Sequence, residues 1–171
     1  MPDAKALERL AHIIDAEHED RSVVRGVTHT HCRAEIEVEA AAIGPTLERL
    51  RAEGYTMLVS LHGVDYLPEE PRLGVAYELL SMHHQDRVSV KVRVPIDEPR
   101  IPSVTPAWPT ADYQEREAFD MFGIVFDGHP DLRRILLPED YLGHPQRRDF
   151  PIGGEPVLFT ENETGNPGWW K

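Results

Sequence analysis

Cysteine is the rarest residue in this sequence of 171 residues, because Cys32 is the only one. A single thiol forms no internal disulfide, which is typical of a reducing, cytosolic compartment. An iron–sulfur cluster usually takes four thiolates, so the chain alone is not expected to hold one. His29 and His31 precede the cysteine, but on a strand they lie on the face opposite to Cys32. Zinc sites show two closely spaced ligand pairs, so the sequence predicts no metal site.

Long apolar runs and positive charge are also lacking. No apolar run approaches the roughly 18 residues that a membrane-spanning helix needs, so such a helix is excluded. The first ten residues contain acids and no apolar centre, so they are not expected to be a secretory signal. Acidic residues outnumber basic ones by 30 to 18, which gives a net charge of −12. This excess argues against binding to nucleic acid and against direct binding to anionic lipid.

The glycine-rich motifs that hold nucleotides are absent from the sequence. Neither GxGxxG nor GxxxxGK[ST] occurs, so neither a dinucleotide fold nor a phosphate-binding loop is predicted. Fifteen of the 18 basic residues are arginine, and arginine suits fixed, two-pronged contacts with carboxylates. The excess of arginine therefore favours protein interfaces over mere solubility.

The pattern of apolar residues predicts an α+β domain. Helical spacing predicts helices over residues 4–18 and from Gly44 to about Glu53. Alternation and turn signals predict strands over the ranges 22–27, 33–39, 55–66, 74–83 and 87–94. In the second of these strands, the three glutamates are expected on a solvated face. Short links between the last three strands imply antiparallel neighbours, so we expect a two-layer domain with helices on a mixed or antiparallel sheet.

The chain changes character after residue 94. Five prolines within 95–109 predict an extended connector with little ladder bonding. A helix is then expected over 110–122, with Thr110 as its N-cap and Gly123 at its end. The segment 127–171 is rich in proline and glycine and shows no useful period. It is expected to form an extended C-terminal arm that wraps its own domain, 1–126, or a partner.

Glu115 is the most informative residue of the predicted helix. At about 100° per residue it lies in the middle of the apolar face, whereas Arg116 and Asp120 lie on the far side at a spacing suited to an ion pair. A buried carboxylate must be paired or neutral, so we expect Glu115 to pair with an arginine of the arm or of a partner. The alternative is an acid–base pair of Glu115 with Glu117, although no nucleophile or ligand set lies nearby in sequence.

The arm contains a near-repeat of a Gly-His-Pro turn followed by an arginine pair. Its copies are built from His129, Arg133 and Arg134 and from His144, Arg147 and Arg148. Paired arginines suit phosphate, but no glycine-rich loop opens a helix here. Docking of the arm onto protein is therefore preferred over phosphate binding. The apolar anchors that follow the two arginine pairs are Ile135, Leu136, Leu137 and Phe150.

Residues 115–136 contain a long pattern of residues at fixed spacing. It reads Glu-Arg-Glu, two residues of any type, an acid, two apolar residues, six residues of any type, His, three residues of any type and Arg. The matching positions are Glu115, Arg116, Glu117, Asp120, Met121, Phe122, His129 and Arg133, followed by Ile135 and Leu136. This pattern resembles the 30 kDa subunit family of respiratory complex I, which is the C subunit in the bacterial NADH–quinone oxidoreductase. The segments 88–94, 100–104 and 108–109 fit as well. Gln146 and Arg148 depart from the family, where an apolar residue and a lysine are common.

The resemblance implies a non-redox scaffold subunit in the hydrophilic peripheral arm of a proton-translocating complex, beside subunits B and D. That complex passes electrons from NADH through FMN and iron–sulfur clusters, all held by partner subunits, to quinone. No cofactor and no catalytic residue are then expected in this chain, and the motif residues are expected at interfaces. The implied location is the cytoplasmic side of the cell membrane, with membrane association only through the complex.

Two other functions stay open on the sequence. Subunits of related complexes with another donor, of the ferredoxin, F420H2 or hydrogenase type, share much of the pattern. A stand-alone acid–base enzyme that uses Glu115 and Glu117 belongs to a different class. A scaffold subunit alone should show no turnover and should co-purify with subunits B and D.

Overall fold

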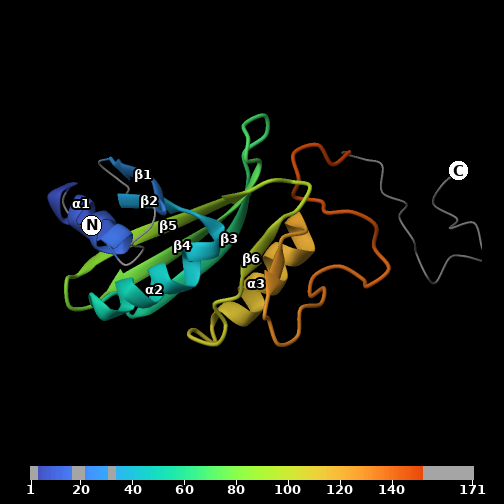
Figure 1. The fold of residues 1–171 in the computed structure, drawn as a ribbon. Helices are drawn as coiled ribbons and strands as arrows, with labels where there is room; N and C mark the ends of the chain where they lie inside the picture. The colour runs from blue at the N-terminus through green and yellow to red at the C-terminus, as the bar shows by residue number, and fades with distance from the viewer. Residues whose placement is uncertain (1–3, 17–21, 31–33, 152–171) are drawn as a thin grey trace, which may run out of the picture.

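The computed structural model describes residues 4–16, 22–30 and 34–151 (Figure 1). In chain order, its elements are α1 (Ala4–Ala16), β1 (Val24–His29), β2 (Ala34–Val38), the 3-10 helix η1 (Ala40–Ala42), α2 (Ile43–Ala52), β3 (Met57–Asp65), β4 (Leu73–Ser81), β5 (Asp86–Val94), β6 (Arg100–Pro102), α3 (Ala111–Phe122) and β7 (Val125–Asp127). Every predicted helix and strand is present, with bounds shifted by a few residues. Within the described ranges, no helix has the length and apolarity that crossing a membrane requires.

Five strands form one sheet in the order β1-β2-β5-β4-β3. The pairs β5–β4 and β4–β3 are antiparallel, as the short links predict, β1–β2 is antiparallel as well, and β2–β5 is parallel. A parallel pair needs a long crossover, and here the chain passes through α2 and the β3–β4 hairpin before it returns beside β2. The predicted α+β class, with helices on a mixed and mostly antiparallel sheet, is therefore confirmed.

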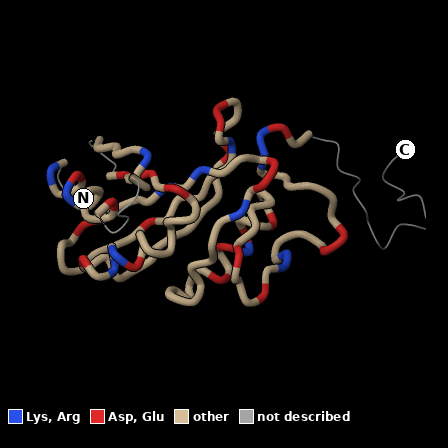
Figure 2. The backbone as a smooth tube through the Cα atoms, in the orientation of Figure 1, with Lys and Arg blue, Asp and Glu red and all other residues tan. Residues whose placement is uncertain are grey.

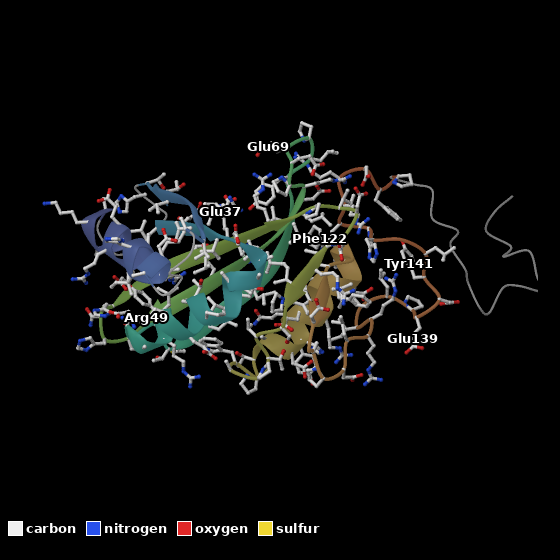
Figure 3. The ribbon with its side chains drawn as sticks, viewed as in Figure 1. Glu37, Arg49, Glu69, Phe122, Glu139 and Tyr141 are labelled. Atoms are coloured by element: carbon white, nitrogen blue, oxygen red, sulfur yellow. The ribbon has the colours of Figure 1, made fainter. Side chains whose placement is uncertain are left out.

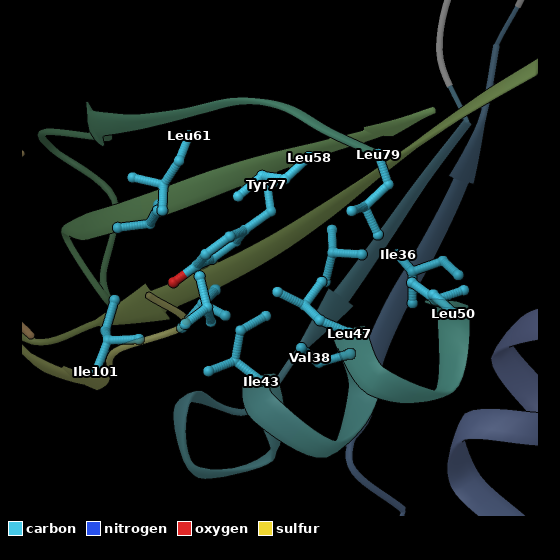
Figure 4. Packing of buried hydrophobic residues seen from close by; sticks show 14 of the residues in the cluster. Ile36, Val38, Ile43, Leu47, Leu50, Leu58, Leu61, Tyr77, Leu79 and Ile101 are labelled. Carbon is cyan, nitrogen blue, oxygen red and sulfur yellow. The ribbon is translucent and has the colours of Figure 1, made fainter. Parts of the chain in front are cut away.

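Much of the core lies between this sheet and the helices α1 and α2 (Figure 4), and the same cluster continues to buried residues of α3. Tyr77 of β4 and Val90 of β5 are paired in register, and both are fully buried at 0% exposure. Helix α2 turns its buried Leu47 and Leu50 toward the sheet. Each fully buried leucine stabilises the fold by about 2 kcal/mol relative to an exposed one, so this helix is held by packing rather than by helix propensity.

The face of β2 that carries its glutamates is less exposed to solvent than the sequence predicts. Glu35 is only 9% exposed, because the Nζ atom of Lys91 on β5 lies 2.7 Å from its Oε2 atom. The expectation of a fully solvated face is therefore wrong at this position. A cation on the neighbouring strand neutralises the carboxylate and lets it pack against the sheet.

The proline-rich connector is not free of ladder bonding, and that expectation is corrected. β6 pairs in parallel with β7. The amide of Val125 donates to the Pro99 carbonyl and the amide of Ser103 donates to the Asp127 carbonyl, each at 2.8 Å. Proline lacks an N–H but keeps its carbonyl, so a proline-rich strand can still accept from one side. Because β7 ends at Asp127, the arm begins at Gly128, just past the predicted boundary.

Helix α3 packs closely against the edge strand β3. A Cβ atom on Gly63 of β3 would lie 2.4 Å from the Phe122 ring, so only glycine allows this approach. The amide of Leu61 on the same strand donates to the side-chain Oε1 of Gln114. Gly123 ends the helix in the left-handed conformation, at φ +75°, as predicted.

Thr110 takes the N-cap position of α3, but the predicted capping by its side chain is wrong. The residue already has helical backbone angles, φ −66° and ψ −17°. Its hydroxyl is therefore not aimed at the free amides of the first turn. Instead, the amides of Ala111 and Asp112 donate to the carbonyls of Trp108 and Pro109, so the preceding turn satisfies the helix start.

Candidate functional site

The motif residues gather where residues 128–151 lie against α3, and we call this segment the docked arm. It leaves the sheet after β7, passes along α3 and ends near the β3–β4 loop (Figure 1). Figure 3 shows Phe122 on the helix, between the sheet and the arm. Within the chain itself, Arg134 and Arg147 hold the arm against α3 and Arg148 holds it to the β3–β4 loop, whereas the side chain of Arg133 pairs with Asp131 of the arm. Phosphate binding is not supported, because most of these arginines donate to carbonyls and carboxylates of the chain.

Asp120 organises the first part of the docked arm from inside the helix. The residue is fully buried, and its Oδ1 atom lies 2.6 Å from Nη1 of Arg134. Its Oδ2 atom accepts the backbone N–H groups of Ile135, Leu136 and Leu137 at 3.1, 2.8 and 2.9 Å. Burial alone would raise the pKa of Asp120. The hydrogen bonds from the three backbone amides and from the arginine outweigh burial and lower the pKa. The carboxylate is therefore held charged.

The predicted ion pair between Arg116 and Asp120 is wrong. Asp120 lies on the side of α3 that the arm covers, so it is buried and paired with Arg134 instead. The Nε atom of Arg116 donates to the backbone carbonyl of Arg133 at 3.3 Å, and its guanidinium lies 5.7 Å from the ring centre of Tyr113. The side chain of Arg133 makes an exposed ion pair with Asp131 at 2.9 Å.

The second copy of the near-repeat caps the C-terminus of α3. Three consecutive carbonyls at the helix end lack partners inside the helix and accept from the arm. The bonds run from His144 Nδ1 to Asp120 O (3.0 Å), from Gln146 N to Met121 O (3.2 Å) and from Arg147 Nε to Phe122 O (2.7 Å). The positive charge of Arg147 also suits the negative end of the helix dipole.

Gly123 makes this cap possible for two reasons. Its φ of +75° is strained for any residue with a side chain. In addition, a Cβ atom here would lie 2.5 Å from Nε2 of His144 and 2.6 Å from Nη2 of Arg147. The two side chains that cap the helix therefore occupy the space that only glycine leaves open.

The end of the docked arm is fastened to the sheet by a buried arginine. Nη2 of Arg72 lies 2.7 Å from Oδ2 of Asp65 and 2.6 Å from Oδ1 of Asp149. The side chains of Arg72 and Asp65 are 7% and 1% exposed, whereas that of Asp149 is 53% exposed. The amide of Arg148 adds a bond of 2.8 Å to Asp65. Hydrogen bonding by Arg72 holds the pKa of Asp65 well below its ordinary range.

Glu115 is fully buried, as predicted, but its predicted partner is wrong. Among the described residues, its hydrogen bonds come from the connector and not from an arginine. Its carboxylate accepts from the Ser103 hydroxyl at 2.6 Å, from the Val104 amide at 2.8 Å and from the Thr105 hydroxyl at 3.2 Å. Burial raises the pKa of Glu115 above its ordinary value, although these hydrogen bonds act in the opposite direction.

His129 closes the same buried site from the arm. Its ring is fully buried, and Nε2 lies 3.9 Å from Oε2 of Glu115. The amide of Asp131 donates to Nδ1 at 3.0 Å, so Nδ1 carries no proton. The proton therefore sits on Nε2, which donates to the backbone carbonyl of Asp112 at 3.3 Å. The first Gly-His-Pro turn is thus fixed to the first half of α3 by one imidazole tautomer.

The Glu115→Gln variant is expected to become more stable than wild type as the pH rises. A carboxyl whose pKa is raised by folding stabilises the fold below its unfolded pKa of about 4.3, and that gain is lost as the pH rises through the folded pKa. Glutamine keeps an acceptor for Val104 but cannot ionise. The difference in unfolding free energy should therefore grow by up to about 1.4 kcal/mol per pH unit within that window. Urea unfolding at several pH values measures it, and a difference independent of pH would contradict it.

Glu115 and Glu117 do not form a catalytic pair. Two residues apart on a helix, they face different sides, and Glu117 is exposed while Glu115 is buried. Glu117 lines a cavity of about 40 Å³ between α3 and β3. No group of three or more His, Cys, Asp or Glu side chains in the described ranges could hold a metal ion. His31 and Cys32 lie outside those ranges.

Sequence reasoning missed three residues that fasten the arm: Asp65, Arg72 and Asp149. Arg72 follows the turn-rich stretch before β4, where a lone arginine resembles any solvated loop residue. Its only sequence signal is the general excess of arginine over lysine, which favours fixed contacts.

Solved structures with a similar fold include the following two. The trypsin-resistant fragment (1–134) of Nqo5 aligns with a TM-score of 0.63 and 32% identity, over 74% of this chain and 98% of that one. A chain of the membrane-bound sulfane sulfur reductase, an archaeal respiratory membrane complex, aligns with a TM-score of 0.67 and 26% identity, over 82% and 85%. The class of protein is therefore an α+β domain of a kind that occurs in an archaeal respiratory membrane complex.

The sequence comparison gives the family. The chain belongs to the family of the respiratory-chain NADH dehydrogenase 30 Kd subunit, whose model matches residues 36–156. The C subunit of the NADH-quinone oxidoreductase of Roseiflexus castenholzii is 50% identical over 142 residues, which cover 83% of this chain and 80% of that one. The corresponding C subunit of Saccharopolyspora erythraea is 54% identical over 66% of this chain and 46% of its own length, so this chain spans about half of that relative.

Proposed function

We propose that this chain is a non-redox scaffold subunit in the peripheral arm of a proton-translocating NADH–quinone oxidoreductase. It contacts subunits B and D on the cytoplasmic side of the membrane and associates with the membrane only through the complex. Electrons pass from NADH through FMN and iron–sulfur clusters of the partner subunits to quinone, and this chain holds no cofactor. The observation that carries the proposal is the use of the motif residues. Asp120, Arg134 and Arg147 fasten chain segments to one another instead of lining an enclosed pocket.

Removal of the arm is expected to abolish assembly while the domain stays folded. A cut after Val125 would also remove the buried Phe126 and would leave Asp120 unpaired, so the sharper cut is after Leu137. That variant keeps the bonds of Asp120 to residues 134–137. A tagged chain is expressed in its host, and recovery of subunits B and D from mild detergent is scored. Wild type should recover both, and the shortened chain neither.

The controls separate a scaffold from an enzyme. Circular dichroism and a melting curve must show that the shortened chain is folded. The purified wild-type chain should be colourless, free of stoichiometric iron and without turnover. Flavin absorbance in the lone chain, or full assembly of the shortened chain, would contradict the proposal.

A related complex with another electron donor is the second candidate, and the likeness to the sulfane sulfur reductase chain favours it. The same purification distinguishes the two candidates. An intact complex that reduces quinone with NADH supports the first candidate. A complex that accepts electrons only from ferredoxin, F420H2 or hydrogen supports the second.

A further inference from the structure

The loop between Arg134 and Gly143 is the most unusual surface of the docked arm, and we call it the Arg134–Gly143 loop. It is closed at its base, because Nη2 of Arg134 donates to the Gly143 carbonyl at 3.1 Å. Inside it, the amide of Tyr141 donates to the Pro138 carbonyl at 3.1 Å, which makes a turn of four residues. The guanidinium of Arg134 lies 5.9 Å from the ring centre of Tyr141. The loop is therefore held in one shape from within.

Two large apolar side chains stand exposed on this loop. Leu136 is 61% exposed and Leu142 is 89% exposed. The backbone of Leu136 is fixed, because its amide and that of Leu137 donate to the buried carboxylate of Asp120. A backbone that is already fixed loses little further entropy when a partner covers the side chain that it presents. Exposed leucines on a rigid backbone are thus suited to act as anchors of an interface.

Two unpaired carboxylates occupy the tip of the same turn. Glu139 and Asp140 are both exposed, and neither has a hydrogen bond or ion pair among the described residues. Figure 2 shows acidic residues at the outer bend of the arm, and Figure 3 shows Glu139 on the side that faces away from the sheet. The neighbouring Arg134 donates to Asp120 and to the Gly143 carbonyl and forms no ion pair with either of these two carboxylates.

We infer that the Arg134–Gly143 loop docks into an apolar socket rimmed by lysine or arginine on a neighbouring protein subunit. The inference rests on the scaffold function proposed above and adds the contact element and the chemistry of its partner. A second copy of this chain is a poor occupant, because its net charge of −12 would repel the acidic tip. Anionic lipid is disfavoured for the same reason.

Two loop variants and two matched controls test the inference in tagged full-length chains. Leu136→Ser with Leu142→Ser removes the anchors, and the control removes two exposed methionines elsewhere, Met57 and Met82, at 49% and 69% exposure. Glu139→Lys with Asp140→Lys reverses the tip charge. Its control reverses another exposed acidic pair, Asp97 and Glu98, in the connector.

Both loop variants should reduce recovery of partner subunits from host membranes by about tenfold or more, and both controls should match wild type. The effect of the charge reversal should shrink when the salt concentration is raised, because rim charges are screened. If the loop variants recovered as much of the partner subunits as wild type does, while the chain shortened after Leu137 recovered none, this inference would be overturned and the scaffold function would stand. Failure of the wild-type chain to recover any subunit would overturn the scaffold function instead. Concentration-dependent dimers of the pure chain that vanish in the loop variants would overturn the assigned partner.

Discussion

Asp120→Ala is expected to lower the free energy of unfolding by about 3–5 kcal/mol, which is typical for the loss of one partner from a buried ion pair. The substitution leaves the largely buried Arg134 without its carboxylate. It also leaves three backbone amides, of residues 135–137, without the acceptor that now fixes them. Part of the loss should appear as opening of the docked arm rather than as global unfolding, because the arm can exchange these bonds for bonds to water.

Two measurements check this result. Urea unfolding gives the change in free energy, and limited trypsin digestion at Arg133 and Arg134 reports arm opening. If opening becomes easier by about 3 kcal/mol, cleavage should accelerate by about a hundredfold. Asp131→Ala is the matched control, since it removes an exposed carboxylate from the same arm and should cost at most about 1 kcal/mol. Equal stability and equal digestion rates for the two variants would show that Asp120 does not hold the arm.

The outcome for Asp120 shows what helical spacing can and cannot predict. The period of about 3.6 residues placed Glu115 correctly on the buried face of α3. The same period placed Asp120 on the far side, next to Arg116, because the rule treats the far side as solvent. In this fold the far side is covered by the docked arm, which comes from later in the chain.

The sheet was predictable for a different reason. Alternating or continuous apolar residues identify the strands β3, β4 and β5 in the sequence. The short links between them require consecutive strands to pair antiparallel, so their order is predictable. The parallel pair β2–β5 was open on the sequence, because strands so far apart along the chain carry no local signal of their register. The pairing of β6 with β7 does not follow from the rule that a proline-rich stretch has little ladder bonding, because proline removes only the donor and keeps its carbonyl acceptor.

The sequence predicts that the arm residues dock the arm, but it does not predict which groups they contact. An excess of arginine and two rigid Gly-His-Pro turns indicate fixed docking, and in the structure Arg134 and Arg147 donate to residues of α3. The acceptors are mostly backbone carbonyls, and a carbonyl leaves no trace in the sequence. The pairing of Arg72 with Asp149 was out of reach as well, because it joins residues 77 positions apart.

Arg72→Met is also expected to lower the free energy of unfolding by about 3–5 kcal/mol, but here the charge left buried without a partner is negative. The arginine is the shared cation of two carboxylates, and one of them, Asp65, is 1% exposed. Without the arginine, Asp65 becomes an uncompensated buried charge, and the end of the docked arm loses its link to the sheet through Asp149. Differential scanning calorimetry and urea unfolding measure the loss.

Two further variants identify the buried charge as the cause. Asp149→Asn should cost at most about 1 kcal/mol, because Asp149 is 53% exposed and water replaces the lost contact. Asp65→Asn combined with Arg72→Met should be more stable than Arg72→Met alone, since the amide still accepts from the Arg148 amide and carries no charge. A double variant as unstable as the single one would assign the effect to lost packing of the arginine instead.

The dependence on pH provides an independent check with a fixed sign. Hydrogen bonding to Arg72 lowers the pKa of Asp65, so the stabilisation from this pair is complete above the unfolded pKa of about 3.9 and is lost as the pH falls toward the folded value. Wild type and Arg72→Met should therefore differ most near neutral pH, and their unfolding free energies should converge as the pH falls below about 4. Glu115 titrates with the opposite sign, so its Gln variant separates from wild type as the pH rises. If the gap between wild type and Arg72→Met stayed constant down to acid pH, the ion pair would not be its source.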